Sequence, residues 1–316
     1  MPKKVVLINV NYPDYEVEKR VLAPLDAEIS HVVTHDLSST IEAARFADAV
    51  MVRETLFPRA FIEALENCKI IARYGVGVDN VDLETARERR IYVSNVVDYG
   101  TGTVADHAIA LMYAVARRVA QRDKDVRKGS WDIGAREPLF SMDGKVLGIA
   151  GCGKIGRTLA RKCSCLGFSE ILGCDPYAQQ IDGIKMTDFD MLLENSDIIS
   201  LHMPLTPESK HVINKKTLEK MKPNAIIINT SRGGLINQED LAEALGQNKI
   251  FGAGIDVFEQ EPPARDNPLF SLANVVVSDH TAWYSVESLE KLQYRAAMEV
   301  ARVFRGEEPA SWVNRW

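Results

Sequence analysis

The sequence lacks the features that mark membrane and nucleic-acid-binding proteins. No run of about 18 apolar residues without charges occurs in its 316 residues, so we predict no membrane span. Basic residues are not in excess, since 38 lysines and arginines are interspersed with 44 aspartates and glutamates. The net charge of −6 therefore argues against a nucleic-acid partner.

Cysteine is scarce, and its pattern excludes a disulfide framework. The five cysteines are an odd number without zinc-ligand spacing, so we predict no metal site. Free thiols fit a reducing compartment, and we expect a cytoplasmic protein. The apolar run at residues 5–10 could open a signal peptide, but Asn9, Asn11 and Pro13 interrupt it. We interpret this run as a buried strand.

Short runs rich in Val and Ile alternate with amphipathic segments, which is typical of βαβ units in an α/β fold. One long helix is predicted from residue 101 to about 122, because apolar or small residues recur there at spacings of three and four. A final helix is predicted at 286–304. The predicted strands lie near residues 5–10, 28–33, 49–52, 70–74, 92–95, 146–150, 171–174, 198–202, 225–229, 251–255 and 275–278.

A glycine loop follows the predicted strand at residues 146–150. Gly151, Gly153 and Gly156 form a GxGxxG pattern that opens a predicted helix at 155–166. The first glycine permits a tight turn, the second lets the backbone approach a diphosphate, and the third lets helix and strand pack closely. Because the diphosphate would bind the unpaired N–H groups of the helix, the loop predicts a dinucleotide site.

Asp175 ends the next predicted strand, 19 residues after Gly156. A carboxylate at this separation accepts hydrogen bonds from the adenosine ribose and repels a 2′-phosphate. We therefore predict NAD rather than NADP as the cofactor. The alternative, that Asp175 only begins a turn with Pro176, is less favoured because of the glycines upstream.

Arg232, Glu261 and His280 each follow a predicted strand in the second half of the chain. Loops at the carboxyl ends of parallel strands line the ligand crevice, so these side chains can converge. An arginine holds a carboxylate and polarises a ketone, a histidine transfers a proton, and a carboxylate orients that histidine. Taken singly, each would more often be a surface or structural residue. Together, they predict hydride transfer to a 2-keto acid.

The segments 230–234 (TSRGG) and 256–262 (DVFEQEP), with His280, resemble the D-isomer-specific 2-hydroxyacid dehydrogenases. The resemblance covers the chain from about residue 70 to its end. It implies that Arg232, Glu261 and His280 are catalytic, with His280 as the acid/base, Glu261 orienting it and Arg232 binding the substrate. The implied reaction is the reversible reduction of a small 2-keto acid to a 2-hydroxy acid by NADH.

The same resemblance assigns further ligand contacts. It places the substrate carboxylate on the backbone of Val76 and Gly77, and the far end of the substrate near Arg53. Trp283 would narrow the substrate pocket. The segment 280–285 (HTAWYS), which contains it, resembles the branch of the family that includes the C-terminal-binding-protein corepressors. Besides the three glycines and Asp175, the implied NAD contacts are Thr103, Lys154, Ile155, His202, Pro204, Thr206, Thr230, Ser231 and Asp256.

The resemblance also implies the domain organisation. We expect two doubly wound parallel-sheet domains, in which a Rossmann NAD-binding domain at residues 99–284 is inserted into a flavodoxin-like substrate domain. The substrate domain would consist of residues 1–98 and 285–316, with the active site in the cleft between the domains. A homodimer is expected through the predicted helix at 101–122 and the stretch 129–140.

Two alternatives remain open at this point. A D-3-phosphoglycerate dehydrogenase would share these motifs, although no regulatory domain follows within the 316 residues. A non-catalytic, NADH-sensing interaction protein related to the corepressors is suggested by Trp283. The presence of Arg232, Glu261 and His280 favours an enzyme over that second alternative.

Overall fold

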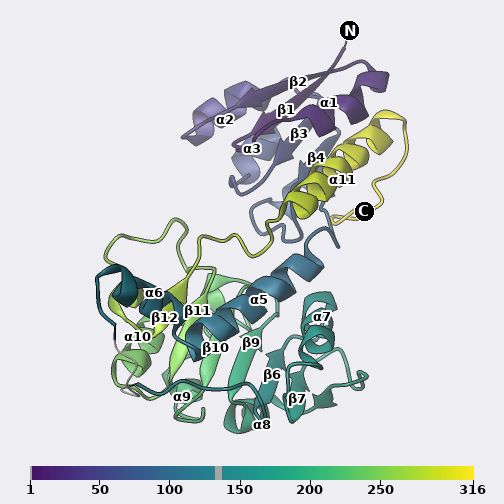
Figure 1. The fold of residues 1–316 in the computed structure, drawn as a ribbon. Coiled ribbons are helices and arrows are strands. Elements are labelled where there is room, and N and C mark those ends of the chain that lie inside the picture. Colours follow the sequence, from purple (N-terminus) through teal and green to yellow (C-terminus); the bar gives the residue numbers. More distant parts are fainter. Residues whose placement is uncertain (1, 132–136) are drawn as a thin grey trace. The chain divides into compact units, whose positions relative to one another are not determined.

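The chain divides into two compact units. The computed structural model describes all residues except 1 and 132–136. Unit 1 consists of Met1–Gly100 and Ser285–Trp316, and unit 2 is Thr101–Tyr284 (Figure 1). Within the described residues, no helix is long and apolar enough to cross a membrane.

Unit 1 contains a five-stranded sheet in the order β2-β1-β3-β4-β5, in which every neighbouring pair is parallel. This is the flavodoxin-like order, and its direction reverses between β1 and β3, the point at which such sheets bind ligands. The strands are β1 (Lys3–Ile8), β2 (Ala27–Val32), β3 (Ala49–Val52), β4 (Ile70–Arg73) and β5 (Tyr92–Ser94).

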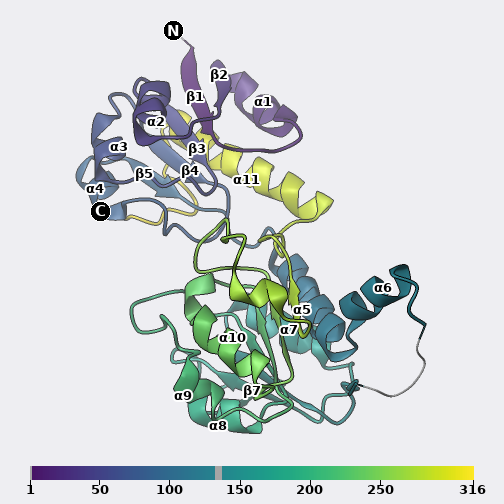
Figure 2. The same ribbon diagram turned by 90° about the vertical axis from the view of Figure 1, so that its left-hand side faces the viewer.

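Helices cover both faces of the unit 1 sheet (Figure 2). Phe61, Ile62 and Ala86, from the helices on one face, share a buried core with Val6 and Ile8 of β1. On the other face α1 packs against α11, which also contacts β4. The helices are α1 (Glu16–Leu22), α2 (Leu37–Ala44), α3 (Arg59–Ala64), α4 (Leu83–Glu88) and α11 (Val286–Phe304), with a 3-10 turn, η1 (Ala23–Leu25).

The C-terminal segment completes unit 1. Asn314 is buried, and its side chain accepts a hydrogen bond from the Val93 N–H (2.8 Å) and donates one to the Ile91 carbonyl (2.9 Å). Trp312 forms an antiparallel bridge with Ser94. These contacts cover the outer edge of β5, which would otherwise present unpaired backbone groups.

Unit 2 contains a seven-stranded, wholly parallel sheet in the order β12-β11-β10-β9-β6-β7-β8. The order reverses between β6 and β9, as in Rossmann domains. The strands are β6 (Val146–Ala150), β7 (Glu170–Cys174), β8 (Lys185–Met186), β9 (Ile198–Leu201), β10 (Ile226–Asn229), β11 (Gly252–Ile255) and β12 (Val275–Val277).

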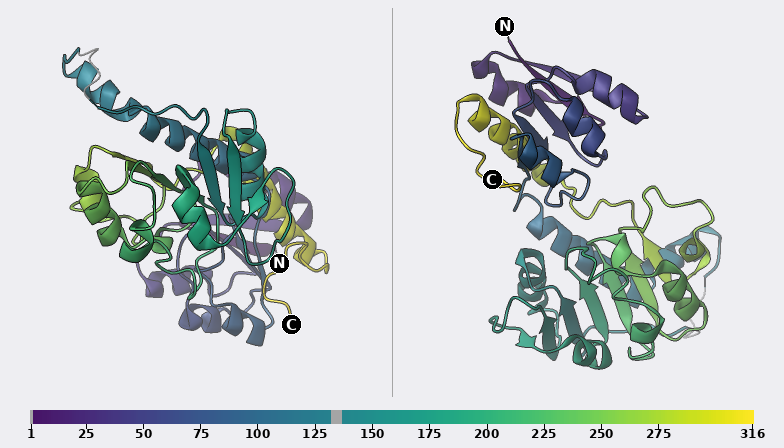
Figure 3. Two further views of the ribbon diagram at one scale, coloured as in Figure 1. Left: turned by 90° about the horizontal axis from the view of Figure 1, so that it is seen from below. Right: turned by 180° about the vertical axis from the view of Figure 1, so that it is seen from behind.

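The inner strands of unit 2 are mostly apolar because both faces of the sheet are covered (Figure 3). Along β10, Ile226 and Ile228 belong to the core beneath α5 and α7, whereas Ile227 belongs to the core beneath α8 and α10. The helices are α5 (Thr101–Ala116), α6 (Val119–Arg127), α7 (Lys154–Cys163), α8 (Phe189–Asn195), α9 (Lys215–Leu218) and α10 (Gln238–Gly246), with 3-10 turns η2 (Gly233–Leu235) and η3 (Pro268–Ser271).

The predicted α/β class and the parallel sheets are confirmed, and each predicted strand is present with its ends within two residues. The prediction of a single helix over residues 101–122 is wrong. Arg118 adopts a left-handed conformation (φ 50°) that separates α5 from α6. Val115 is buried, but Val119 is 55% exposed, because the next turn finds no core to pack against. Part of the predicted interface stretch, 132–136, lies outside the described residues.

Candidate active site

The glycine loop joins β6 to α7, and its close packing requires glycine at two positions. Gly151 has a φ of 94°, and a Cβ on it would lie 2.5 Å from the backbone carbon of His202. A Cβ on Gly156 would lie 2.2 Å from the Gly151 carbonyl oxygen. By contrast, nothing lies within 4 Å of the position of a Cβ on Gly153. The first and third glycines thus serve packing, and the second leaves open space.

Asp175 lies beside this loop, as the sequence predicts. Its carboxylate accepts hydrogen bonds from the N–H groups of Cys152 and Tyr177, both at 2.8 Å. Lys154 and Ile155 lie in the first turn of α7, where the backbone N–H groups have no acceptor within the helix and face the start of the loop. The loop, the helix end and the acid therefore form one site.

Two predicted cofactor contacts have buried polar atoms without a partner among the described residues. They are Nδ1 of His202 and Oγ1 of Thr230. The other ring nitrogen of His202 bonds to Ser200 Oγ at 2.8 Å, and burial lowers the pKa of His202 to about 4. Since buried polar groups normally have partners, these atoms fit a bound cofactor. Pro204 and Thr206 follow His202 in the loop after β9, and Thr103 lies in the first turn of α5.

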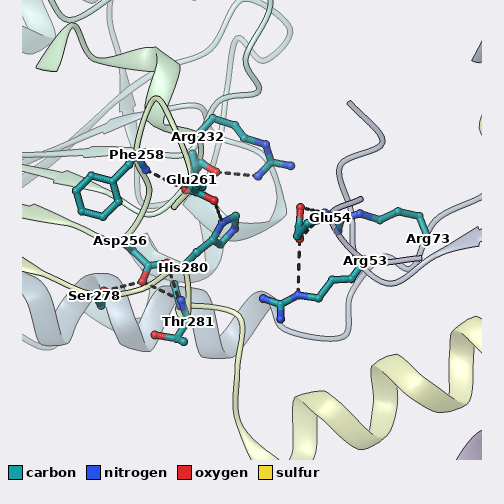
Figure 4. A network of polar contacts seen from close by, with 12 residues as sticks. Arg53, Glu54, Arg73, Arg232, Asp256, Phe258, Glu261, Ser278, His280 and Thr281 are labelled. Carbon is teal, nitrogen blue, oxygen red and sulfur yellow. Dashed lines mark hydrogen bonds and ion pairs between the residues drawn. The ribbon is translucent and has the colours of Figure 1, made fainter. Parts of the chain in front are cut away.

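Glu261 and His280 are joined by a short hydrogen bond in unit 2. Oε2 of Glu261 lies 2.6 Å from Nδ1 of His280, and Oε1 accepts a hydrogen bond from the Phe258 N–H at 2.9 Å (Figure 4). Nε2 of His280 has no partner among the described residues. The His280 side chain is 26% exposed, so this nitrogen is available to a ligand.

Several charges act on Glu261. Burial by itself would raise its pKa, but the hydrogen bond and charge of His280, the Phe258 N–H and the charge of Arg232 together lower it. Glu261 is therefore ionised at neutral pH. An ionised carboxylate accepts a hydrogen bond from Nδ1–H and so fixes the orientation of the imidazole.

Arg232 is brought close to this pair by contact between two loops. It directly follows the 229–231 segment after β10, and its Nη1 donates to the Ser231 carbonyl at 2.8 Å. A Cβ on the next residue, Gly233, would lie 1.9 Å from the backbone carbon of Phe258. Glycine at this position lets the Arg232 loop contact the Glu261 loop. Figure 4 shows Arg232, Glu261 and His280 gathered together.

Asp256, predicted to contact NAD, is fully buried and bonds to the loop that carries His280. Its carboxylate accepts hydrogen bonds from Ser278 Oγ (2.6 Å) and from the N–H groups of Thr281 and Ala282 (both 3.0 Å). Its carbonyl accepts the His280 N–H at 2.8 Å. His280 has a left-handed backbone (φ 56°), which is unfavourable for a residue other than glycine. Asp256 therefore stabilises the backbone conformation in which the His280 side chain reaches Glu261.

Sequence reasoning did not find two members of this network. Ser278 ends the predicted strand at 275–278, and that position by itself indicates no role. His107 lies within α5, and its Nε2 is 2.8 Å from Ser278 Oγ. A histidine inside an amphipathic helix gives no signal of such a contact, since the partner comes from a strand end 171 residues away.

The predicted carboxylate-binding residues, Val76 and Gly77, lie in unit 1 after β4. Neither backbone N–H donates a hydrogen bond to any described residue, and Val76 is 50% exposed. Gly75 precedes them with a φ of 139°, and a Cβ on it would lie 1.5 Å from Nη1 of Arg73. Two adjacent free N–H groups are suited to an anion.

Arg53 also lies in unit 1, where β3 ends at the reversal of the sheet order. Its guanidinium is 3.8 Å from the Glu54 carboxylate, which is bonded more closely by the buried Arg73 (2.9 Å), as Figure 4 shows. Trp283 belongs to unit 2 and packs edge-on against Tyr284, with ring centres 5.5 Å apart. The substrate roles of these residues stay predictions.

Comparison with known proteins identifies the family. Residues 109–282 match the model of the D-isomer specific 2-hydroxyacid dehydrogenase, NAD binding domain. The chain belongs to this family. Unit 2 contains its NAD-binding domain, so NAD is the cofactor, and the chain is an oxidoreductase of the class that acts on 2-hydroxyacids.

Individual relatives agree with this membership. The glyoxylate reductase of Thermococcus litoralis is 41% identical over 287 residues, which cover 87% of this chain and 86% of that protein. The D-3-phosphoglycerate dehydrogenase of Archaeoglobus fulgidus is 38% identical over 275 residues, covering 84% of this chain. This chain spans about half of that relative, 51% of its length. The crystal structure of the TT0316 protein from Thermus thermophilus covers 98% of this chain and 99% of its own, with 31% identity and a TM-score of 0.91.

The three glycines allow a test of the cofactor site. Gly153→Ala should leave the melting temperature nearly unchanged but weaken NADH binding by at least ~10-fold, since the added methyl enters the open space in front of the loop. Gly156→Ala should lower the melting temperature, because its methyl meets the Gly151 carbonyl. NADH titration by fluorescence and thermal unfolding measure the two effects. Unchanged NADH affinity in Gly153→Ala would mean that no diphosphate approaches the loop.

Proposed function

We propose that this chain catalyses the reversible, NADH-dependent reduction of a small 2-keto acid to the D-2-hydroxy acid. The observation that carries the proposal is the 2.6 Å contact of Glu261 with His280, beside Arg232. A histidine oriented by a carboxylate and an arginine that can polarise a carbonyl are the groups that this reduction requires.

In the proposed mechanism, each residue has a separate task. Arg232 binds the substrate carboxylate and polarises the ketone, with the free N–H groups of Val76 and Gly77 as further carboxylate donors. His280, with its Nδ1–H held by Glu261, gives a proton from Nε2 to the ketone oxygen. When bound, NADH supplies the hydride that reduces C2. In the reverse direction, Nε2 of His280 accepts the proton of the hydroxyl group.

The remaining predicted contacts select the substrate in this proposal. Trp283 limits the room for the substrate side chain, which favours small keto acids such as glyoxylate, the substrate in the name of the Thermococcus litoralis relative. A second candidate, 3-phosphohydroxypyruvate reduction by a D-3-phosphoglycerate dehydrogenase, is supported by Arg53, a cation suited to an anionic far end. Residues 1–98 and 285–316 would form the substrate domain, and residues 99–284 the NAD domain.

We further propose a homodimer formed through α5, α6 and the stretch 129–140. Val119 and Val126 of α6 are 55% and 52% exposed, which supports a partner surface there. Sedimentation at the mass of a single 35.2 kDa chain would contradict the dimer. A cytoplasmic location is supported by the five free cysteines and can be checked by cell fractionation.

A panel of keto acids tests the proposed activity. NADH oxidation, followed by absorbance, should occur with glyoxylate or hydroxypyruvate faster than with pyruvate or larger 2-keto acids. Preference for 3-phosphohydroxypyruvate would instead support the second candidate. If NADH binds but no keto acid of the panel is reduced, the proposed activity is wrong and the NADH-sensing alternative is favoured.

His280→Ala tests the proton donor. The substitution should lower kcat at least ~100-fold while NADH affinity stays within about twofold, because it removes the acid/base group but no cofactor contact. His35→Ala, at an exposed histidine of unit 1, is the matched control and should behave like the unaltered chain. Turnover that survives His280→Ala would exclude His280 as the donor.

A further inference from the structure

Unit 1 contains a buried carboxylate that belongs to none of the predicted site residues. Glu18, on α1, has no exposed surface. Its Oε1 accepts a hydrogen bond from the Tyr74 hydroxyl at 2.7 Å, and its Oε2 accepts one from Nε2 of Gln293 at 3.1 Å. Both partners are neutral, and no lysine or arginine pairs with Glu18 among the described residues.

Burying a carboxylate without a cation is costly, so a group of this kind is rarely kept for packing alone. Burial raises the pKa of Glu18, while the bonds from Tyr74 and Gln293 oppose that rise. A glutamine or a leucine would fill similar space at lower cost. The cost of Glu18 therefore calls for a role that depends on its two hydrogen bonds.

Tyr74 connects Glu18 to the loop that is predicted to hold the substrate carboxylate. Its side chain is 1% exposed, and its ring meets the edge of Tyr12 at 5.2 Å. Its N–H is bonded to the Val52 carbonyl at 2.8 Å, and its carbonyl to Nη1 of Arg73 at 3.0 Å. Tyr74 is thus held both at the backbone and at the end of its side chain, directly before Gly75.

The loop itself is restrained through its carbonyl groups. The Gly75 carbonyl accepts the Val96 N–H at 2.8 Å, and the Val76 carbonyl accepts Nδ2 of Asn95 at 2.7 Å. Each of these carbonyls shares a peptide plane with the N–H of the next residue, so the two bonds hold one side of the loop. The other side is the peptide that enters Gly75, which has no side chain to resist rotation, and it is held through Tyr74 and the Glu18 hydrogen bond.

We propose that Glu18 and Tyr74 are positioning residues for the substrate carboxylate: their hydrogen bond holds residues 75–77 so that the N–H groups of Val76 and Gly77 point outward together. This inference rests on the proposed function, in which those two groups bind the carboxylate. Gln293 extends the arrangement to α11, because its Nε2 also donates to the Asp14 carbonyl at 2.9 Å. The start of α1, the loop and α11 then share one buried network.

The test uses oxamate, a keto-acid analogue that keeps the carboxylate but is not reduced. Its binding to the NADH-loaded protein is followed by NADH fluorescence, so the measurement does not require turnover. Tyr74→Phe, which removes only the hydroxyl, should weaken oxamate about tenfold, the scale expected for a buried partner left unsatisfied. NADH affinity should stay within about twofold. With a reducible keto acid, KM should rise while kcat changes little.

Further variants separate positioning from a general loss of stability. Glu18→Gln keeps one acceptor for Tyr74 and should weaken oxamate less than Glu18→Ala. Because the two residues share one bond, Tyr74→Phe combined with Glu18→Ala should be no worse than the more damaging single change. Tyr294→Phe, at a 48% exposed tyrosine of α11, is the matched control and should have no effect.

The outcomes distinguish this inference from the proposed function. If the unaltered protein reduces keto acids and Tyr74→Phe binds oxamate normally, only the inference is overturned. If oxamate binds and Tyr74→Phe weakens it while no keto acid is reduced, the inference stands and the proposed activity fails. A protein that binds no oxamate and reduces no keto acid overturns both, as neither then has a carboxylate site. Additive effects in the combined variant would also overturn the inference.

Discussion

The position of His280 in the candidate active site depends on the hydrogen bonds that the buried carboxylate of Asp256 accepts. By bonding to Ser278 and to the N–H groups that follow His280, it stabilises a left-handed histidine that would be unfavourable by itself. That conformation directs the imidazole toward Glu261, whose own position is fixed by the Phe258 N–H. The geometry of the Glu261–His280 pair is therefore set by the backbone conformation of the loop after β12.

Close contact between backbones is the second constraint on unit 2. Gly151 and Gly156 let the turn after β6 lie against its neighbours, and Gly233 lets the Arg232 loop lie against Phe258. In a parallel sheet the loops that follow the strands lie at one edge. Glycine at these three positions lets the glycine loop and the Arg232 loop pack closely against their neighbours at that edge. Gly153 differs, since its open surroundings suit a ligand rather than a protein neighbour.

In unit 1, buried polar side chains support the loop after β4. That loop offers two free N–H groups, and the supporting side chains are Arg73 against Gly75, and Glu18 through Tyr74. Glu54 bonds to Arg73 at 2.9 Å and lies 3.8 Å from the guanidinium of Arg53, so its carboxylate offsets part of the positive charge that the two arginines bring to unit 1.

The sequence alone determined the features that depend on residues close along the chain. Strand periodicity and the glycine spacing at 151–156 could be predicted because their signals are local. Arg232, Glu261 and His280 could be singled out because each follows a predicted strand within a short motif. The tertiary structure alone decided the break at Arg118, where the core beneath α5 ends, and the bonding of Asp256 to the His280 loop. It also decided the burial of Glu18 beside Tyr74, 56 residues away. Each of these depends on partners distant in sequence, which spacing does not encode.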